Sequence, residues 1–136
     1  EAVHIPVIAN GDIICARSAA TALAQSGADG VMVGRGAQGR PWMLAQIAHV
    51  LFGTAVPTVP TGDDFIAMVA GHYEDMLAFY GKDLGGRVAR KHLGWYMDTA
   101  DTPIALRRAV LTAPTAADVL GLLPEALGGD AARTAA

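Results

Sequence analysis

The chain has 136 residues, of which 52% are hydrophobic and 17% are charged, and this composition excludes an intrinsically disordered polypeptide. Its formal net charge of −3 excludes a globally basic nucleic-acid binder and leaves a local basic patch as the only basis for such binding. A single cysteine supports no disulfide framework, which fits a cytoplasmic protein, and no apolar run reaches the ~20 residues of a membrane span.

The N-terminal third of the sequence has the pattern of a βαβ unit. Residues 5–10, IPVIAN, form an unbroken apolar run before a Gly-Asp turn, as in a strand covered on both faces. Residues 14–26 predict a helix that Gly27 ends. The expected apolar face of this helix consists of Ile14, Ala20, Leu23 and Ala24. Residues 30–34, GVMVG, predict a second buried strand, parallel to the first.

Helical signals follow this unit through most of the remaining sequence. Pro41 suits the first turn of a helix that Gly53 ends, and a proline-rich linker comes next. Four further helices are then expected, at residues 64–81, 84–98, 102–113 and 115–127. Thr102 and Thr115 are the expected N-caps of the last two, and Pro124 is expected to disturb the last.

The sequence therefore predicts an α/β plus all-α protein. The expected parts are an α/β region at 1–53, a linker at 54–63, a small helical bundle at 64–127 and a flexible tail at 128–136. Two parallel strands alone leave open edges, so the α/β region needs strands from elsewhere. We interpret the chain as the C-terminal part of a longer polypeptide; a cloning boundary or a processed N-terminus are the alternatives.

Flexible, polar sequence follows both predicted strands. The first is followed by NGD and the second by GRGAQGRPW. Ligands of α/β proteins bind at the carboxyl ends of parallel strands, where glycine lets backbone N–H groups approach an anion and Arg35 can contact phosphate oxygens. The alternative is that these glycines only make tight turns. Several glycines beside two arginines favour a phosphate site.

Three motifs in order carry a resemblance to a known family. They are IPVIANGDI, GADGVMVGRGAQGRPW and RVARKHLGWY. Together they resemble the tRNA-dihydrouridine synthase family, closest to its bacterial B-type branch, over about residues 5–127. The resemblance implies the end of a flavin-binding TIM barrel followed by a helical tRNA-binding domain. It implies FMN contacts at Asn10, Gly11, Asp12, Gly34 and Arg35.

Gly36 and Arg40 lie in the same matching stretch and are weaker candidates for FMN binding. The resemblance also implies a reaction: NADPH reduces FMN, the flavin passes hydride to a uracil base of tRNA, and a cysteine protonates the base. That cysteine belongs to the N-terminal half of the barrel, which this sequence lacks. We therefore assign no catalytic residue, interpret Cys15 as a small packing residue, and expect the isolated chain to be inactive.

A basic stripe marks the second half of the sequence. Arg87, Arg90 and Lys91 share one side of the helix expected at 84–98, which predicts contact with the RNA backbone. Gly94 would let a large partner approach the stripe. The alternative is a solvated face, with charges paired to acidic neighbours at Asp83, Asp98, Glu74 and Asp75.

The four histidines, His4, His49, His72 and His92, form no cluster that the sequence reveals, so we expect no metal site. Two other functions stay open at this point. One is a stand-alone RNA-binding helical module with a vestigial barrel segment. The other is a different FMN barrel oxidoreductase, against which the motif RKHLGWY argues.

Overall fold

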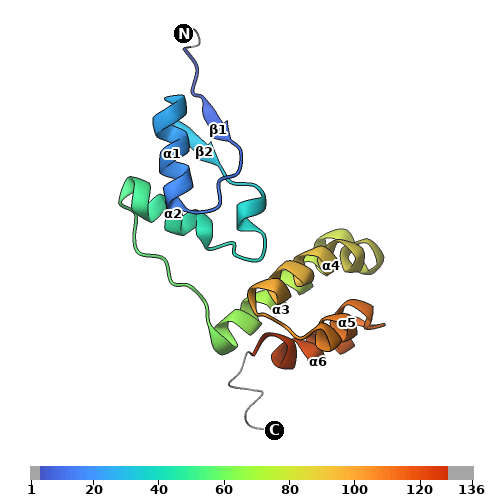
Figure 1. Cartoon of the computed structure of the whole chain (residues 1–136). Coiled ribbons are helices and arrows are strands. Elements are labelled where there is room, and N and C mark those ends of the chain that lie inside the picture. The colour runs from blue at the N-terminus through green and yellow to red at the C-terminus, as the bar shows by residue number, and fades with distance from the viewer. Residues whose placement is uncertain (1–3, 129–136) are drawn as a thin grey trace. The chain divides into compact units, whose positions relative to one another are not determined.

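The computed structural model describes residues 4–128, which divide into two compact units (Figure 1). The first unit ends at Val59 and the second begins at Pro60. The first contains β1 (Ile8–Asn10), α1 (Ala16–Ser26), β2 (Gly30–Met32), the 3-10 helix η1 (Arg35–Ala37) and α2 (Met43–Phe52). The second contains α3 (Gly62–Tyr80), α4 (Lys82–Thr99), α5 (Ile104–Thr112) and α6 (Ala116–Leu127).

The first unit contains the predicted parallel strand pair. β1 and β2 run parallel, with Ile8 opposite Gly30 and Asn10 opposite Met32. α1 connects them and ends at Gly27, whose φ of 64° is left-handed and favours glycine, as predicted. Gly53 ends α2 in the same way, with a φ of 66°.

The strands are shorter and more exposed than the sequence predicts. We expected both to be covered on two faces, but Ile8 is 56% exposed and Met32 is 54% exposed. The core of this unit, which consists of Ile13, Ala19, Met43 and Ile47, is instead built largely by α1 and α2. Helices therefore cover one side of the sheet, and none of the described residues covers the apolar side chains on the other.

The predicted apolar face of the first helix is wrong. α1 begins at Ala16, so Ile14 precedes it and is 56% exposed. Ala19 is buried, whereas Ala20 and Ala24 are exposed. The buried face therefore centres on Ala19, which lies about 100° around the helix from Ala20. Pro41 likewise precedes its helix, because α2 begins at Met43.

α3 and α4 form a helical hairpin, joined by Gly81 with a φ of 76°. They approach closely at Gly85, where an added Cβ would lie 2.7 Å from the carbonyl oxygen of Met76. The core of the unit includes Phe65, Val69, Leu93, Met97, Val110 and Leu123. Gly62 and Asp63, expected in the linker, form the start of α3.

One of the two predicted threonine caps is present. Thr115 caps α6, where its hydroxyl accepts a hydrogen bond from the backbone N–H of Asp118 at 3.1 Å. The disturbance expected at Pro124 is not seen, because α6 continues through this residue to Leu127. Thr102 does not cap α5, because Pro103 is its N-cap. The Thr102 hydroxyl instead donates to the carbonyl oxygen of Ala126 at 2.6 Å.

Among residues 4–128, no helix is both long and apolar enough to cross a membrane. The tail expected at 128–136 lies, after Gly128, outside the described residues.

Candidate functional site

Each of the two strands of the first unit is followed by a polar turn, and both turns lie at the same edge of the sheet. β1 ends at Asn10, followed by Gly11 and Asp12 with φ values of 143° and 46°. β2 ends at Met32, two residues before Gly34 begins the turn into η1. Because the strands are parallel, both turns lie at their carboxyl ends.

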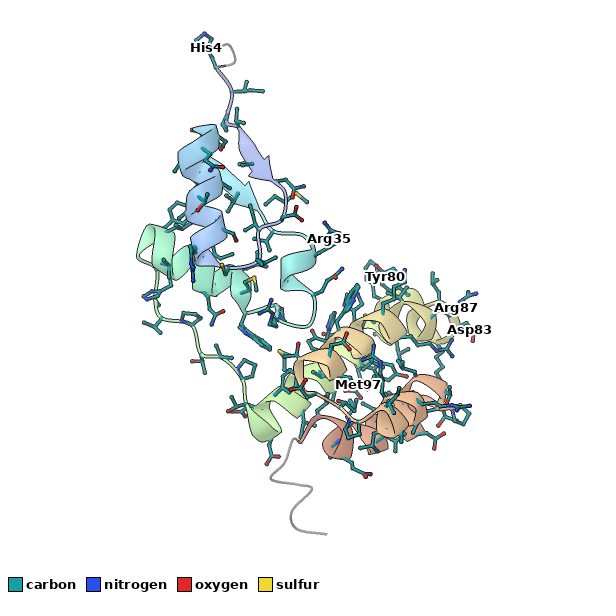
Figure 2. The ribbon with its side chains drawn as sticks, in the orientation of Figure 1. His4, Arg35, Tyr80, Asp83, Arg87 and Met97 are labelled. Atoms are coloured by element: carbon teal, nitrogen blue, oxygen red, sulfur yellow. The ribbon has the colours of Figure 1, made fainter. Side chains whose placement is uncertain are left out.

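An ion pair joins these turns. The Arg35 Nη2 atom donates to the Asp12 Oδ1 atom at 3.0 Å, and the two side chains are 83% and 90% exposed. Figure 2 shows Arg35 projecting outward from η1. An ion pair this exposed contributes little to stability. The exposed Arg35 guanidinium can therefore also contact a second oxyanion beside Asp12.

Gly36 determines how closely the second turn approaches the first. It is buried, and a Cβ added to it would lie 2.2 Å from the carbonyl oxygen of Ile13 and 3.0 Å from the Cα atom of Ile14. Only glycine allows the backbone of η1 to lie against the backbone that follows Asp12. The sequence alone marks this glycine less clearly than Gly34.

An open hollow of about 640 Å³ lies between the turns. Its lining includes four of the five residues predicted to bind FMN, which are Asn10, Asp12, Gly34 and Arg35. Gly11 is not part of the lining, but it shapes the turn. Gly36 and Arg40 also line the hollow. Two guanidinium groups against one carboxylate, beside glycine backbone, fit an oxyanion such as phosphate.

The basic stripe lies on α4 in the second unit. Arg87, Arg90 and Lys91 are exposed, and none forms an ion pair within residues 4–128. Asp98, one of their expected partners, instead pairs with Arg107 from α5. Arg87 and Arg90 line a second hollow, of about 590 Å³, whereas Lys91 does not.

The sequence model of the dihydrouridine synthase family matches residues 1–128. The chain belongs to the dihydrouridine synthase family. It is 58% identical over 125 residues to a probable tRNA-dihydrouridine synthase of Rhodobacter capsulatus. It is 46% identical over 110 residues to a probable tRNA-dihydrouridine synthase of Rickettsia conorii, and 44% identical over 130 residues to tRNA-dihydrouridine synthase B of Vibrio parahaemolyticus.

These alignments cover most of the chain but a minor part of each relative. They include 92%, 81% and 95% of the chain, against 38%, 33% and 39% of the respective relatives. The family resemblance predicted from three motifs is thereby confirmed, including the similarity to B-type proteins. The chain spans about two fifths or less of the length of these relatives.

The one cysteine of this dihydrouridine synthase segment does not pack as expected. Cys15 is exposed at the N-cap of α1, with its Sγ atom 3.7 Å from the Ser18 hydroxyl. Hydrogen bonds from the backbone and side chain of Ser18 lower the pKa of this thiol. Cys15 is not among the residues that line the strand-end hollow, so its geometry gives it no place in that site.

Two of the four histidines, between which the sequence reveals no relation, are neighbours in the helical unit. The rings of His72 and His92 pack edge to face with centroids 5.0 Å apart, and the His72 Nδ1 atom lies 2.9 Å from the Tyr96 hydroxyl. Burial and then the nearby His72 lower the pKa of His92. Among residues 4–128, no group of three or more His, Cys, Asp or Glu side chains is placed to hold a metal ion.

Gly94 does not provide the open approach expected beside the basic stripe. It is buried, and its carbonyl oxygen accepts a hydrogen bond from the Arg107 Nη1 atom at 2.9 Å. A Cβ at this position would lie 3.1 Å from the Arg107 Nη2 atom. The missing side chain of Gly94 therefore leaves room for Arg107 of α5 and not for an external partner.

Proposed function

We propose that the chain is the C-terminal part of an FMN-dependent tRNA-dihydrouridine synthase. In such an enzyme FMN, reduced by NADPH, supplies the hydride that converts a uridine base of tRNA to 5,6-dihydrouridine. Two observations support the proposal: the family membership, and the meeting of Arg35, Asp12 and Gly36 at the ends of two parallel strands. The second observation carries the assignment to a flavin phosphate.

The residues around the strand-end hollow have distinct roles in this proposal. The Arg35 guanidinium binds the phosphate oxygens, with Asp12 orienting it through their 3.0 Å contact. Gly34 and Gly36 bring backbone N–H groups to the phosphate without a Cβ in the way. The Asn10 side chain supplies an amide at the end of β1, and Gly11 holds the turn that presents Asp12.

We further propose that the strand pair belongs to a TIM barrel completed by the N-terminal half of the same protein. The exposed apolar side chains of Ile8 and Met32 support this, because further barrel strands and their interior side chains would cover them. The greater length of the relatives also supports it. The barrel segment is assigned to residues 1–53, the linker to 54–63 and the tRNA-binding helical domain to 64–127.

In this arrangement the helical domain contacts tRNA through Arg87, Arg90 and Lys91. Their exposure and lack of ion pairs within the described residues leave their charges available to RNA phosphates. The segment contributes no catalytic acid, so we expect the isolated chain to be inactive. Detection of NADPH-dependent uridine reduction by the purified 136-residue chain would contradict this part of the proposal.

The decisive experiment uses a full-length protein that contains this segment. In the variant Asn10→Ala/Arg35→Ala we expect FMN occupancy, measured by flavin absorbance after purification, to fall strongly, and dihydrouridine formation with it. Arg17→Ala is the control, because Arg17 is an exposed cation on α1 that does not line the hollow. Undiminished FMN in the double variant would refute the phosphate assignment.

A further inference from the structure

The second unit contains a hollow that the proposed flavin chemistry does not use. It has a volume of about 590 Å³ and is bounded by α3, by α4 and by the connection from α5 to α6. Side chains that define its chemistry are Tyr73, Lys82, Asp83, Arg87, Arg90 and Thr115. Figure 2 shows Asp83 and Arg87 at the same end of α4.

Tyr73 contributes a hydroxyl group to a hollow that its largely buried side chain lines. The residue is only 5% exposed, and its hydroxyl forms no hydrogen bond within the described chain. In the same part of the chain, every fully enclosed side-chain polar atom has a partner. The Tyr73 hydroxyl is therefore not fully enclosed. Tyr73 lines the hollow and its hydroxyl lies within the electrostatic influence of Arg90, so an acceptor bound there can receive a hydrogen bond from it.

The charges around the hollow favour an anionic acceptor. Lys82, Arg87 and Arg90 line it against a single carboxylate, that of Asp83. No ion pair within residues 4–128 involves any of these four side chains. The positive charge is thus not neutralised locally. Burial raises the pKa of Tyr73, against an opposing effect of the Arg90 charge, so the hydroxyl stays protonated and able to donate.

The first turn of α6 supplies further donors. Ala116 and Ala117, the first two residues of this helix, line the hollow, and the N–H groups of a first turn have no partner within the helix. Asp118 follows them, but its Oδ2 atom is engaged by the Thr115 hydroxyl at 2.6 Å and by the Thr115 backbone N–H at 3.2 Å. This carboxylate serves the helix cap.

We propose that this hollow binds one phosphate group, held by Arg87, Arg90 and Lys82 and by the Tyr73 hydroxyl. The source of the phosphate is taken to be the backbone of RNA, and this identification rests on the proposed function. A phosphate has several acceptor oxygens, so it satisfies cations and a neutral hydroxyl at once. Lys91, which lies outside the hollow, is then only a peripheral contact.

Binding of labelled tRNA to the 136-residue chain, measured by fluorescence anisotropy at fixed salt, tests whether the bound phosphate belongs to RNA. We expect Tyr73→Phe, which removes only the hydroxyl, and Arg90→Gln each to weaken binding about tenfold. The matched control is Arg108→Gln, because Arg108 is an exposed cation on α5 that does not line the hollow, and it is expected to weaken binding about twofold or less. Asp83→Asn is expected to tighten binding a few-fold. Far-UV circular dichroism verifies the fold of each variant.

A titration with inorganic phosphate tests the site itself. We expect phosphate to shift the backbone amide NMR signals of Ala116 and Ala117 in the wild-type chain and not in Arg90→Gln. If phosphate does so while tRNA affinity is unchanged in Tyr73→Phe and Arg90→Gln, the site takes free phosphate and the RNA identification is overturned.

If phosphate leaves these signals unmoved, and Arg108→Gln weakens tRNA binding as much as Arg90→Gln, the hollow is not a site. FMN occupancy depends on the other unit, so either result leaves the test of the proposed function intact.

Discussion

Replacing Gly36 by alanine tests whether the close approach of the two strand-end turns is a structural requirement. The added Cβ would lie 2.2 Å from the Ile13 carbonyl oxygen, about 1 Å closer than the ~3.3–3.6 Å at which carbon and oxygen atoms normally approach. It would also lie 3.0 Å from the Ile14 Cα atom. Both obstacles are backbone atoms, so no side-chain rotation relieves the overlap.

The structure also sets the size of the expected effect. Adding a methyl group to a packed region lowers the free energy of unfolding by about 1–3 kcal/mol. Because the obstacles are rigid, we expect Gly36→Ala to lower it by about 3 kcal/mol. Gly30→Ala is the matched control in the same unit. Its Cβ would lie 3.1 Å from the Cδ1 atom of Ile8, a terminal methyl group that can move aside. We expect this control to change the free energy of unfolding by about 1 kcal/mol or less.

Urea unfolding followed by Trp42 fluorescence measures the stability of the first unit. The chain has two tryptophans, so both variants are made in a Trp95→Phe background. For an unfolding slope of about 1 kcal/mol per M urea, Gly36→Ala lowers the midpoint by about 3 M or removes the transition. Equal midpoints for Gly36→Ala and Gly30→Ala would refute the argument that η1 needs glycine for contact with the backbone after Asp12.

Two further predictions concern the helical unit. Gly85→Ala places a Cβ 2.7 Å from the Met76 carbonyl oxygen, so we expect it to lower the free energy of unfolding by about 3 kcal/mol. The Cβ of Gly86→Ala meets nothing within 4 Å, so we expect this variant to raise the free energy of unfolding by about 0.5–1 kcal/mol. Thermal unfolding followed by circular dichroism compares the two variants, and similar effects would contradict the close approach of α3 and α4. The pKa of His92 is lowered in the folded state, so the unfolded chain binds a proton at this residue more readily. The folded state is therefore most stable above the ordinary histidine pKa of about 6.5, and its stability falls as the pH drops below that value. Urea midpoints at about pH 7.5 and 5.5 should differ less in His92→Gln than in the wild type, and an unchanged difference would contradict this role.

Local signals in the sequence predict much of this structure correctly. Gly27 and Gly53 end helices because their left-handed φ values suit only glycine well, and that preference is visible in the sequence. The cap at Thr115 follows from its own side chain and from Asp118 three residues later. The βαβ order follows from apolar runs and the turn residues between them. Each of these inferences uses residues a few positions apart.

The features that the sequence does not predict depend on distant residues. Gly94 is closed by Arg107 from another helix, so a glycine that suggests an open surface is a packing site. His72 and His92 meet only because α3 and α4 form a hairpin. Tyr73 has the spacing of a core residue, which it is, and nothing in its neighbourhood along the chain indicates that it also lines a hollow.

The two hollows differ in how their positive charge is balanced, and this difference predicts which ligand each hollow binds in the chain on its own. At the strand ends, Asp12 already pairs with Arg35, so a phosphate there must compete with a carboxylate and needs additional contacts to bind tightly. Under the proposed function, a flavin would gain those contacts from the rest of a barrel. In the helical unit, Arg87 and Arg90 have no carboxylate partner among the described residues, so a phosphate binds without displacing one. The segment alone should therefore bind phosphate through its helices while failing to retain FMN, and FMN binding should return only when the complete sheet is present.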